Sequence, residues 1–130
     1  MDATLSKTLP RLIAPLNDDF VADVEGMGIY HLDQKRYLVA SSQGNNSYGV
    51  FALDDRNRYL GSFTIDMNLP ANIDGVSETD GLEISSLSFG DAFPNGVMVA
   101  QDGRNVMPSL NQNFKLVDAT QIAQLIRHWL

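Results

Sequence analysis

The segment "GMGIYHLDQKRYLVASSQGNNSYGVFALDDRNRYLGSFTI", residues 26–65, decides the fold. It holds four short runs rich in β-branched and aromatic residues, and turn-forming or charged clusters separate them. Such runs at close spacing predict strands joined by hairpin loops. The four expected strands are residues 26–31, 37–42, 47–53 and 59–65. The segment therefore predicts an antiparallel four-stranded meander.

The side-chain pattern within these runs indicates how each strand is covered. In residues 47–53 both alternating sets of side chains are largely apolar, which predicts a strand buried on two faces. In the fourth run, Tyr59, Phe63 and Ile65 are expected on one face, because successive side chains of a strand point to opposite sides. The turn "SQGNNS", residues 42–47, is rich in residues that tolerate left-handed backbone angles.

A second group of strand-like runs follows at residues 81–89, 96–101 and 113–117. The stretches "LVASSQGNN" and "VMVAQDGRN" share an apolar strand that enters a Gln/Asp-Gly-x-Asn turn, so the two groups are related in pattern. Each group has the size of one antiparallel, four-stranded blade of a β-propeller. We therefore predict an all-β partial propeller over residues 1–130, with one blade at about 23–68 and a second at about 74–118.

The C-terminal residues, about 119–130, change to a helical period. Asp118 is expected to cap a helix, with Gln121 as the reciprocal capping partner. Apolar residues then follow at helical spacing: Ile122, Leu125, Ile126, Trp129 and Leu130. We expect a short α-helix that packs against the outside of a sheet.

The charge balance excludes several classes of partner. Nine Lys and Arg against sixteen Asp and Glu give a formal net charge of -7 over 130 residues. This balance argues against binding of nucleic acid or an anionic membrane through bulk charge. The chain has no cysteine, which excludes disulfides and thiolate metal sites. With two histidines, His31 and His128, a histidine-rich zinc site is not expected.

Acidic loops at strand ends are the strongest chemical signal. "IDGVSETDGLEI", residues 73–84, carries four carboxylates and no basic residue. "DVEG", residues 23–26, also precedes a predicted strand, and "QDGRN", residues 101–105, follows one. In a propeller such strand ends converge, and carboxylate, amide and carbonyl oxygens gathered from several loops can hold calcium. Solvation by water alone is the alternative reading.

Five motifs together resemble the C-terminal part of the β-propeller phytases, which are calcium-dependent 3-phytases. They are "DVEGMGIY", "YLVASSQGNNSYGVF", "DGVSETDGLEI", "FPNGVMVAQDGRN" and "NQNFKLVDATQIA", spread over roughly residues 23–126. The resemblance implies a six-bladed propeller that hydrolyses phytate, myo-inositol hexakisphosphate. It also implies calcium ions in a central channel, which screen the phosphate charge and activate water, while Lys and Arg side chains hold the phosphates.

The resemblance assigns roles to individual residues. Carried over motif by motif, the implied calcium ligands are Asp23, Glu25, Gln43, Asp74, Asp80, Asp102 and Asn105. Within this set, Glu25, Asp74 and Asp80 are the expected catalytic groups, as ligands or as groups that orient the attacking water.

Two positions depart from the family pattern. Arg104 stands where Glu is usual, and Met107 stands where Asp is usual. Both changes remove an oxygen ligand, so the resemblance implies weakened calcium binding there. Arg104 is also an expected phosphate-binding residue, and an eroded site is the alternative.

Two blades do not close a six-bladed ring. Because a single repeat cannot bury its own apolar faces, we expect either upstream blades or self-association, in which three copies would supply six blades. Packing of the terminal helix over an exposed blade face is the alternative cover. The N-terminal stretch "LPRLIAPLNDDF", residues 9–20, could supply a strand to a neighbouring blade, although its two prolines make it a poor central strand.

The competing functions are part of a calcium-dependent phytase, a non-catalytic or degenerate propeller module, and a generic all-β binding domain without metal. The module would bind inositol phosphates or act as a structural partner. The resemblance implies a secreted or periplasmic protein, although the sequence shows no signal peptide and no membrane-spanning segment.

Overall fold

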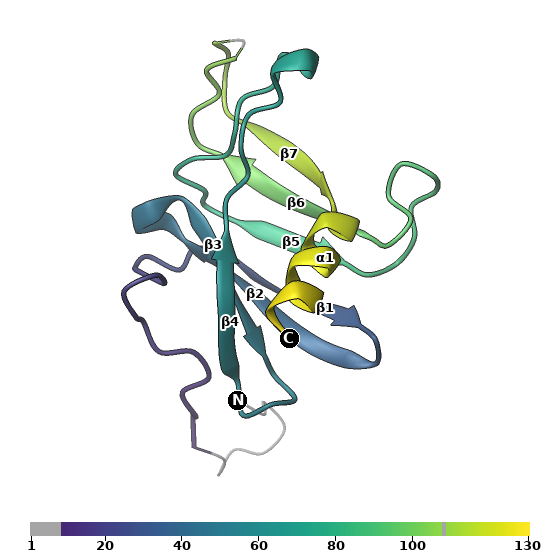
Figure 1. Ribbon diagram of the computed structural model, residues 1–130. Coiled ribbons are helices and arrows are strands. Elements are labelled where there is room, and N and C mark those ends of the chain that lie inside the picture. Colours follow the sequence, from purple (N-terminus) through teal and green to yellow (C-terminus); the bar gives the residue numbers. More distant parts are fainter. Residues whose placement is uncertain (1–8, 108) are drawn as a thin grey trace.

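The computed structural model describes residues 9–107 and 109–130 (Figure 1). Within these residues, seven strands form two antiparallel sheets, and one α-helix follows the last strand. The elements are β1 (Met27–Leu32), β2 (Lys35–Ser42), η1 (Gln43–Asn45), β3 (Ser47–Ala52), β4 (Arg58–Phe63), η2 (Leu69–Ala71), β5 (Leu82–Ser85), β6 (Val97–Asp102), β7 (Asn113–Asp118) and α1 (Ala119–Trp129). The all-β fold with blade-like sheets, as in part of a propeller, is confirmed.

The first sheet has the strand order β1-β2-β3-β4, which is the meander that residues 26–65 predict. Its tight turns use left-handed backbone where the sequence offers tolerant residues. Asp33 and Gln34 have φ of 52° and 65° in the two-residue connection of β1 and β2, and Asn46 has φ of 53° after η1. Two successive positive φ angles match the twist of a hairpin, so the register of β1 on β2 is fixed.

Strand β3 is buried along its whole length, which confirms the prediction of a strand covered on both faces. The expected face of β4 was wrong in one detail. The register shifts between Val50 and Phe51, so Val50 pairs with Gly61 while Phe51 pairs with Tyr59. This bulge turns Tyr59 to the opposite face from Phe63, because one extra residue reverses the alternation of side chains.

The second sheet has the order β5-β6-β7, in agreement with the three strand-like runs of the sequence. Strand β5 is shorter than the expected run 81–89 and ends at Ser85. The chain leaves the sheet because the Ser86 hydroxyl accepts a hydrogen bond from the His31 amide at 2.7 Å, and the Ser85 hydroxyl accepts one from Leu87. Within the described residues, this sheet has three strands, one fewer than the first.

The two sheets pack through the inner face of β1. A Cβ on Gly28 would lie 2.8 Å from Ile84 Cγ2, and one on Gly26 would lie 2.4 Å from the Leu82 nitrogen. The backbones approach this closely because both positions lack a side chain. Around this contact lies one core that includes buried side chains of both sheets and the helix: Tyr30, Tyr37, Val39, Tyr48, Val50, Ala52, Val76, Ile84, Met98, Ala100, Ala119, Ile122, Ala123 and Ile126.

The helix begins as predicted, because the Asp118 carboxylate accepts a hydrogen bond from the Thr120 amide at 2.9 Å. Its position differs from the expected packing on the outside of a sheet and agrees with the alternative, in which it covers an exposed sheet face. It follows the second sheet in the chain but returns to the inner face of the first (Figure 1), where the Trp129 indole would lie 2.7 Å from a Cβ on Gly61. Leu130 is 60% exposed and does not extend the apolar face. The helix therefore covers the part of the first sheet that the second sheet leaves open.

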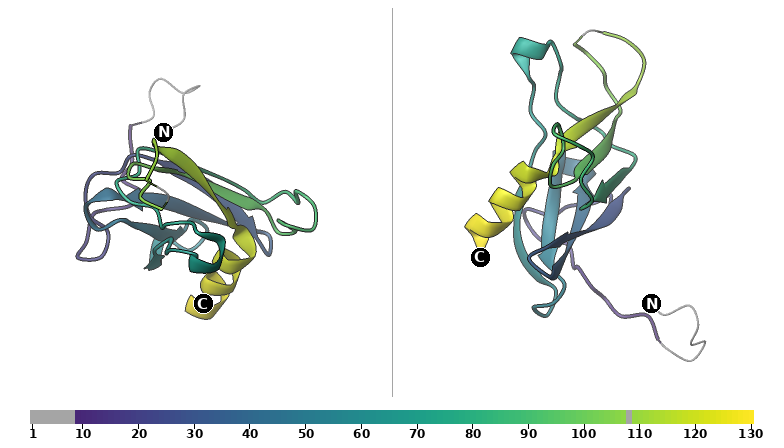
Figure 2. Two further views of the ribbon diagram at one scale, coloured as in Figure 1. Left: turned by 90° about the horizontal axis from the view of Figure 1, so that it is seen from above. Right: turned by 90° about the vertical axis from the view of Figure 1, so that its right-hand side faces the viewer.

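The N-terminal segment covers the outer face of the first sheet. Phe20 is buried, and its ring lies 5.1 Å from that of Phe51 in an edge-on arrangement. Residues 9–20 form no strand in the described part of the chain. Figure 2 shows the segment leaving the molecule on the side opposite to the end of α1.

Across residues 9–107 and 109–130, no helix has the length and apolar character needed to cross a bilayer.

Candidate functional site

A polar hollow of about 590 Å³ lies where the two sheets meet at their loop ends. Three of the sequence-predicted ligands, Asp23, Gln43 and Asp80, share it although they come from distant parts of the chain. The lining residues are Ala22, Asp23, Gln43, Gly44, Glu78, Asp80, Gly103 and Gln112. Glu25 is exposed and is not among these lining residues.

The loop from the first sheet is held by its own backbone. The Gln43 amide donates to the Asp23 carbonyl at 3.0 Å, and the Gly44 amide donates to the Ala22 carbonyl at 3.0 Å. A Cβ on Gly44 would lie 2.5 Å from that carbonyl oxygen, so only glycine fits the approach. These contacts place Asp23 and Gln43 side by side at the rim.

Asp80 is fixed from both sides of the hollow. Its carboxylate accepts a hydrogen bond from Gln43 Nε2 at 3.3 Å, and its backbone amide donates to Gln101 Oε1 at 2.9 Å. Gln43 thus bridges the sheets, because it belongs to the first and Asp80 to the second. The arrangement presents exposed carboxylate and amide oxygens to one space.

Glu78 is a site residue that the sequence reasoning did not single out. Its φ is 48°, in the left-handed region that is costly for a residue with a long side chain. The Glu78 amide donates to Asn46 Oδ1 at 2.9 Å, and this hydrogen bond holds the conformation. The Gly103 backbone packs closely against the Glu78 carbonyl, because a Cβ on Gly103 would lie 2.5 Å from that oxygen.

Arg104 lies beside this residue and pairs with it. Its Nε contacts Glu78 Oε2 at 2.9 Å, and both side chains are more than half exposed. An exposed pair of this kind contributes about 0–1 kcal/mol and exchanges partners easily. The guanidinium therefore reduces the negative charge at one wall of the hollow and stays within reach of an anion.

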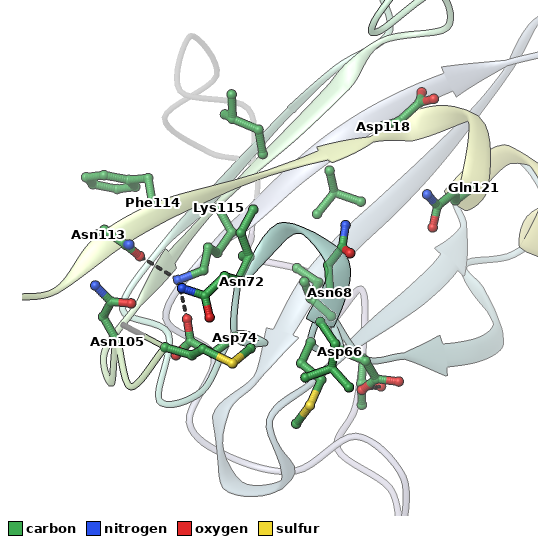
Figure 3. A pocket seen from close by; sticks show the side chains of 18 of the residues that line it. Asp66, Asn68, Asn72, Asp74, Asn105, Asn113, Phe114, Lys115, Asp118 and Gln121 are labelled. Atoms are coloured by element: carbon green, nitrogen blue, oxygen red, sulfur yellow. Dashed lines mark hydrogen bonds and ion pairs between the residues drawn. The ribbon is translucent and has the colours of Figure 1, made fainter. Parts of the chain in front are cut away.

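Three further predicted ligands, Asp74, Asp102 and Asn105, lie in a second, buried cluster around Lys115, and Figure 3 shows Lys115 with Asp74, Asn105 and Asn113. Asp102 is fully buried, and Asp74 and Asn105 are 5% and 7% exposed. Lys115 Nζ lies 2.7 Å from Asp102 Oδ2 and 2.9 Å from Asp74 Oδ1. It also donates to Asn113 Oδ1 at 2.8 Å. Two expected calcium ligands are thus paired with an ammonium group of the chain itself.

This pairing shifts the ionisation of both partners in the cluster. Burial alone would raise the pKa of Asp74, but the hydrogen bond from Val106 and the adjacent Lys115 ammonium hold it below its ordinary value. Burial alone would lower the pKa of Lys115, but Asp102 and Asp74 outweigh that effect and raise it. Asp74 and Lys115 are therefore both ionised across the neutral pH range.

Sequence reasoning missed Lys115, because the local pattern points to an exposed lysine. It stands inside the expected strand 113–117, between Phe114 and Leu116. A lysine between two apolar residues is usually read as the solvated position of a strand. Here the alternation is reversed, because Phe114 and Leu116 are 68% and 60% exposed while Lys115 is buried.

The buried oxygens of this cluster decide whether a hard cation fits. Asn105 Oδ1 accepts no hydrogen bond in the described structure, whereas Asp74 Oδ1, which also accepts none by geometry, lies 2.9 Å from the Lys115 ammonium. Oxygen donors are the ligands that calcium prefers. Yet within residues 9–107 and 109–130, no three carboxylate or histidine side chains are close enough to hold a metal ion by themselves. A cation at this cluster would have to take most of its oxygen ligands from water or phosphate, because the Lys115 ammonium already contacts Asp74 and Asp102.

A larger, mainly apolar groove of about 1010 Å³ runs along β7. Its walls are β7, the start of α1, the connection from β4 to β5 and part of the connection from β6 to β7 (Figure 3). Met67, Leu69 and Leu110 on these walls are 62%, 66% and 69% exposed. Asp74 and Lys115 lie at its floor, so the buried ion cluster separates the apolar groove from the polar hollow.

Blade-like antiparallel sheets with an oxygen-rich hollow at their loop ends define an all-β protein with an acidic site, and such sheets are those expected of part of a propeller. The chain belongs to the Phytase family, whose model matches residues 11–129. It is 46% identical over 110 residues to a 3-phytase of Bacillus subtilis (strain 168). That match covers 82% of this chain and 28% of the relative, so the chain spans little more than a quarter of that protein. The family suggested by the five motifs is confirmed.

Proposed function

We propose that this chain supplies part of a calcium-dependent active site that hydrolyses phosphomonoesters of phytate. The observation that carries the proposal is the polar hollow, which joins Asp23, Gln43 and Asp80 from two sheets. Membership of the Phytase family and the similarity to a 3-phytase support the reaction class.

Charge explains why an acidic hollow suits a phosphate substrate. The chain carries a formal charge of -7, and phytate is itself a polyanion. Carboxylates and phosphates repel one another unless cations lie between them. Calcium bound at Asp23, Asp80 and Gln43 would screen the phosphate charge and lower the pKa of a bound water.

Residues of the chain itself would then have separate roles in binding and orientation. Gln43 orients Asp80 through its hydrogen bond and keeps one carboxylate oxygen aimed into the hollow. Arg104 binds a phosphate by exchanging its weak contact with Glu78 for a charge-assisted one. Asp74 and Glu25 remain proposed catalytic groups, and Asp102 and Asn105 remain proposed ligands. The secreted or periplasmic location belongs to the same proposal.

A second function is favoured by one observation. The ion pair of Arg104 and Glu78 puts a cation at the wall where the family pattern has a carboxylate. This would suit a non-catalytic module that binds inositol phosphates directly through Arg104, with phosphate binding that needs no calcium.

Phosphate release from phytate, measured with calcium and with a chelator, separates the two functions. If the chain forms part of an active site, we expect calcium-dependent release of phosphate, at a rate that is about 10- to 100-fold lower in Asp80→Asn. Asp91→Asn removes the same charge at an exposed residue outside the hollow and should leave the rate unchanged. Equal rates for Asp80→Asn and the wild type would contradict the assignment of the site.

Calcium binding is tested independently of turnover. A ligand that binds only the folded state raises stability, by about 2.7 kcal/mol at a free concentration 100 times its dissociation constant. We expect calcium to raise the melting temperature of the wild type and to do so less for Asp80→Asn. If phytate stabilises the chain in chelator and loses this effect in Arg104→Gln, the binding module is the better description.

The partners belong to the same proposal. Phytate or another inositol phosphate would bind at the hollow, and further blades or further copies would cover the exposed apolar residues of β7, Phe114 and Leu116. Light scattering that gives a monomeric mass, together with calcium-dependent phosphate release, would exclude self-association as a requirement.

A further inference from the structure

Lys115 lies between two loops of the candidate site, the acidic loop that begins at Asp74 and the loop that follows Asp102. It lies on the inner face of β7, paired in register with Ala100, and its side chain is only 9% exposed. Its ammonium contacts Asp74, which opens the acidic loop, and Asp102, which ends β6. The two carboxylates are 28 residues apart in number and share this single cation.

Each of these carboxylates uses its other oxygen to hold the opposite loop. Asp74 Oδ2 accepts a hydrogen bond from the Val106 amide at 2.7 Å, and Asp102 Oδ1 accepts one from the Ser77 amide at 3.2 Å. The Gly103 amide adds a backbone bond to the Ser77 carbonyl at 2.9 Å. The loops are therefore joined by two carboxylate clamps, Asp74 to Val106 and Asp102 to Ser77, and the Lys115 ammonium lies between the two carboxylates.

Removal of this cation would leave two buried carboxylates that repel each other. Uncompensated buried charge is among the most costly defects in a protein interior. The loops would relieve it by separating, and residues 77–80 would move with them. Glu78 and Asp80, which face the polar hollow, follow Ser77 by one and three positions.

From this geometry we infer that Lys115 is the positioning residue of the acidic loop. Its ammonium is the built-in cation that pairs with both Asp74 and Asp102 and sets Glu78 and Asp80 in place before any metal binds. The role of the hollow rests on the proposed function. The ordering of the loops by Lys115 does not.

Amide hydrogen exchange by NMR, on the full chain in chelator without phytate, tests this inference. In the wild type, the amides of Ser77, Glu78 and Val106 should be protected in the absence of calcium. In Lys115→Met they should exchange about 100-fold faster, while the amides of β2 and β3 keep their protection. Lys115→Arg keeps the positive charge and should restore most of the protection.

Two controls separate positioning from a general loss of stability. Lys35→Met makes the same change at an exposed lysine and should alter nothing in the loops. Ile126→Ala weakens the core far from the clamps and should speed exchange in both sheets alike. A Lys115→Met pattern identical to that of Ile126→Ala would overturn the inference.

The wild-type arm needs no variant, so it remains decisive if Lys115→Met does not fold. Loop amides that are unprotected in chelator and become protected only with calcium would show that the metal orders the loops instead of Lys115. Because no step uses phytate, absence of phosphate release would refute the proposed function and leave this result standing.

Discussion

The contact between the two sheets makes Gly26→Ala a sharp test of the fold. A Cβ at this position would lie 2.4 Å from the Leu82 nitrogen and 2.9 Å from two backbone atoms of Gly81. The first distance is about 1 Å shorter than the 3.4 Å at which ordinary contact begins. These are backbone atoms, so no side-chain rotation relieves the overlap and the sheets must move apart.

The expected cost follows from measured overpacking of cores. Such insertions cost about 1–3 kcal/mol. For a chain of this size, that corresponds to a fall in melting temperature of roughly 4–12 °C. Gly26 also joins directly to the loop that carries Asp23, so the polar hollow should lose calcium-induced stabilisation in the same variant.

Gly81→Ala is the matched control, because Gly81 lies on the other side of the same contact. A Cβ there meets no atom within 4 Å, and neither glycine has a positive φ. This variant should be neutral or about 0.4–1 kcal/mol more stable, through a restricted unfolded state. Thermal unfolding by circular dichroism measures both. A Gly26→Ala protein that melts with the wild type would refute the packing described for the sheets.

Three further predictions concern the core and the ionisable groups. Ile126→Ala should lower the free energy of unfolding by about 2–5 kcal/mol in urea, because the side chain is fully buried, whereas Leu130→Ala, at 60% exposure, should change it by less than about 0.5 kcal/mol; equal effects would contradict the docking of α1. Burial raises the pKa of Tyr48 to about 12, above its ordinary value of 10.0, so this phenol stabilises the fold below pH 10 and the contribution is lost as the pH rises toward 12. Absorbance titration of the native protein should therefore show that Tyr48 ionises only near pH 12, and ionisation of all four tyrosines by pH 10.5 would disprove it. The pKa of Asp74 is held below its ordinary value of 3.8, so its contribution is present above that pH and is lost as the pH falls below it; a urea midpoint unchanged from pH 6 down to pH 3 would speak against the buried pair.

Local patterns predicted most of the secondary structure. The alternation in β3, the turn residues between strands and the Asp118 cap act over a few residues, so the sequence alone reveals them. The bulge opposite Tyr59 was not predictable, because the period-2 pattern continues through it and only pairing with β3 shows the shift. The position of α1 likewise depends on a contact between segments far apart in the chain.

The candidate site divides in the same way. Motif resemblance found Asp23, Gln43 and Asp80, which the fold brings into one hollow. It could not show that Asp74 and Asp102 are paired with Lys115, because the partners are 41 and 13 residues away and the lysine lies in a strand outside the acidic motifs. Ion pairs between residues on different strands depend on the tertiary structure, so they cannot be read from the amino-acid composition.

The return of α1 to the first sheet determines how the molecule unfolds. The helix continues the backbone of the second sheet, yet Ile122 and Ile126 belong to the same core as Tyr37 and Val50 of the first. Neither sheet can lose its structure without exposing apolar surface of the other, so the two behave as one cooperative unit despite their separate hydrogen-bond networks. A nick in the connection at residues 66–72 would leave two fragments that still share a complete interface, and they should recombine into the native arrangement.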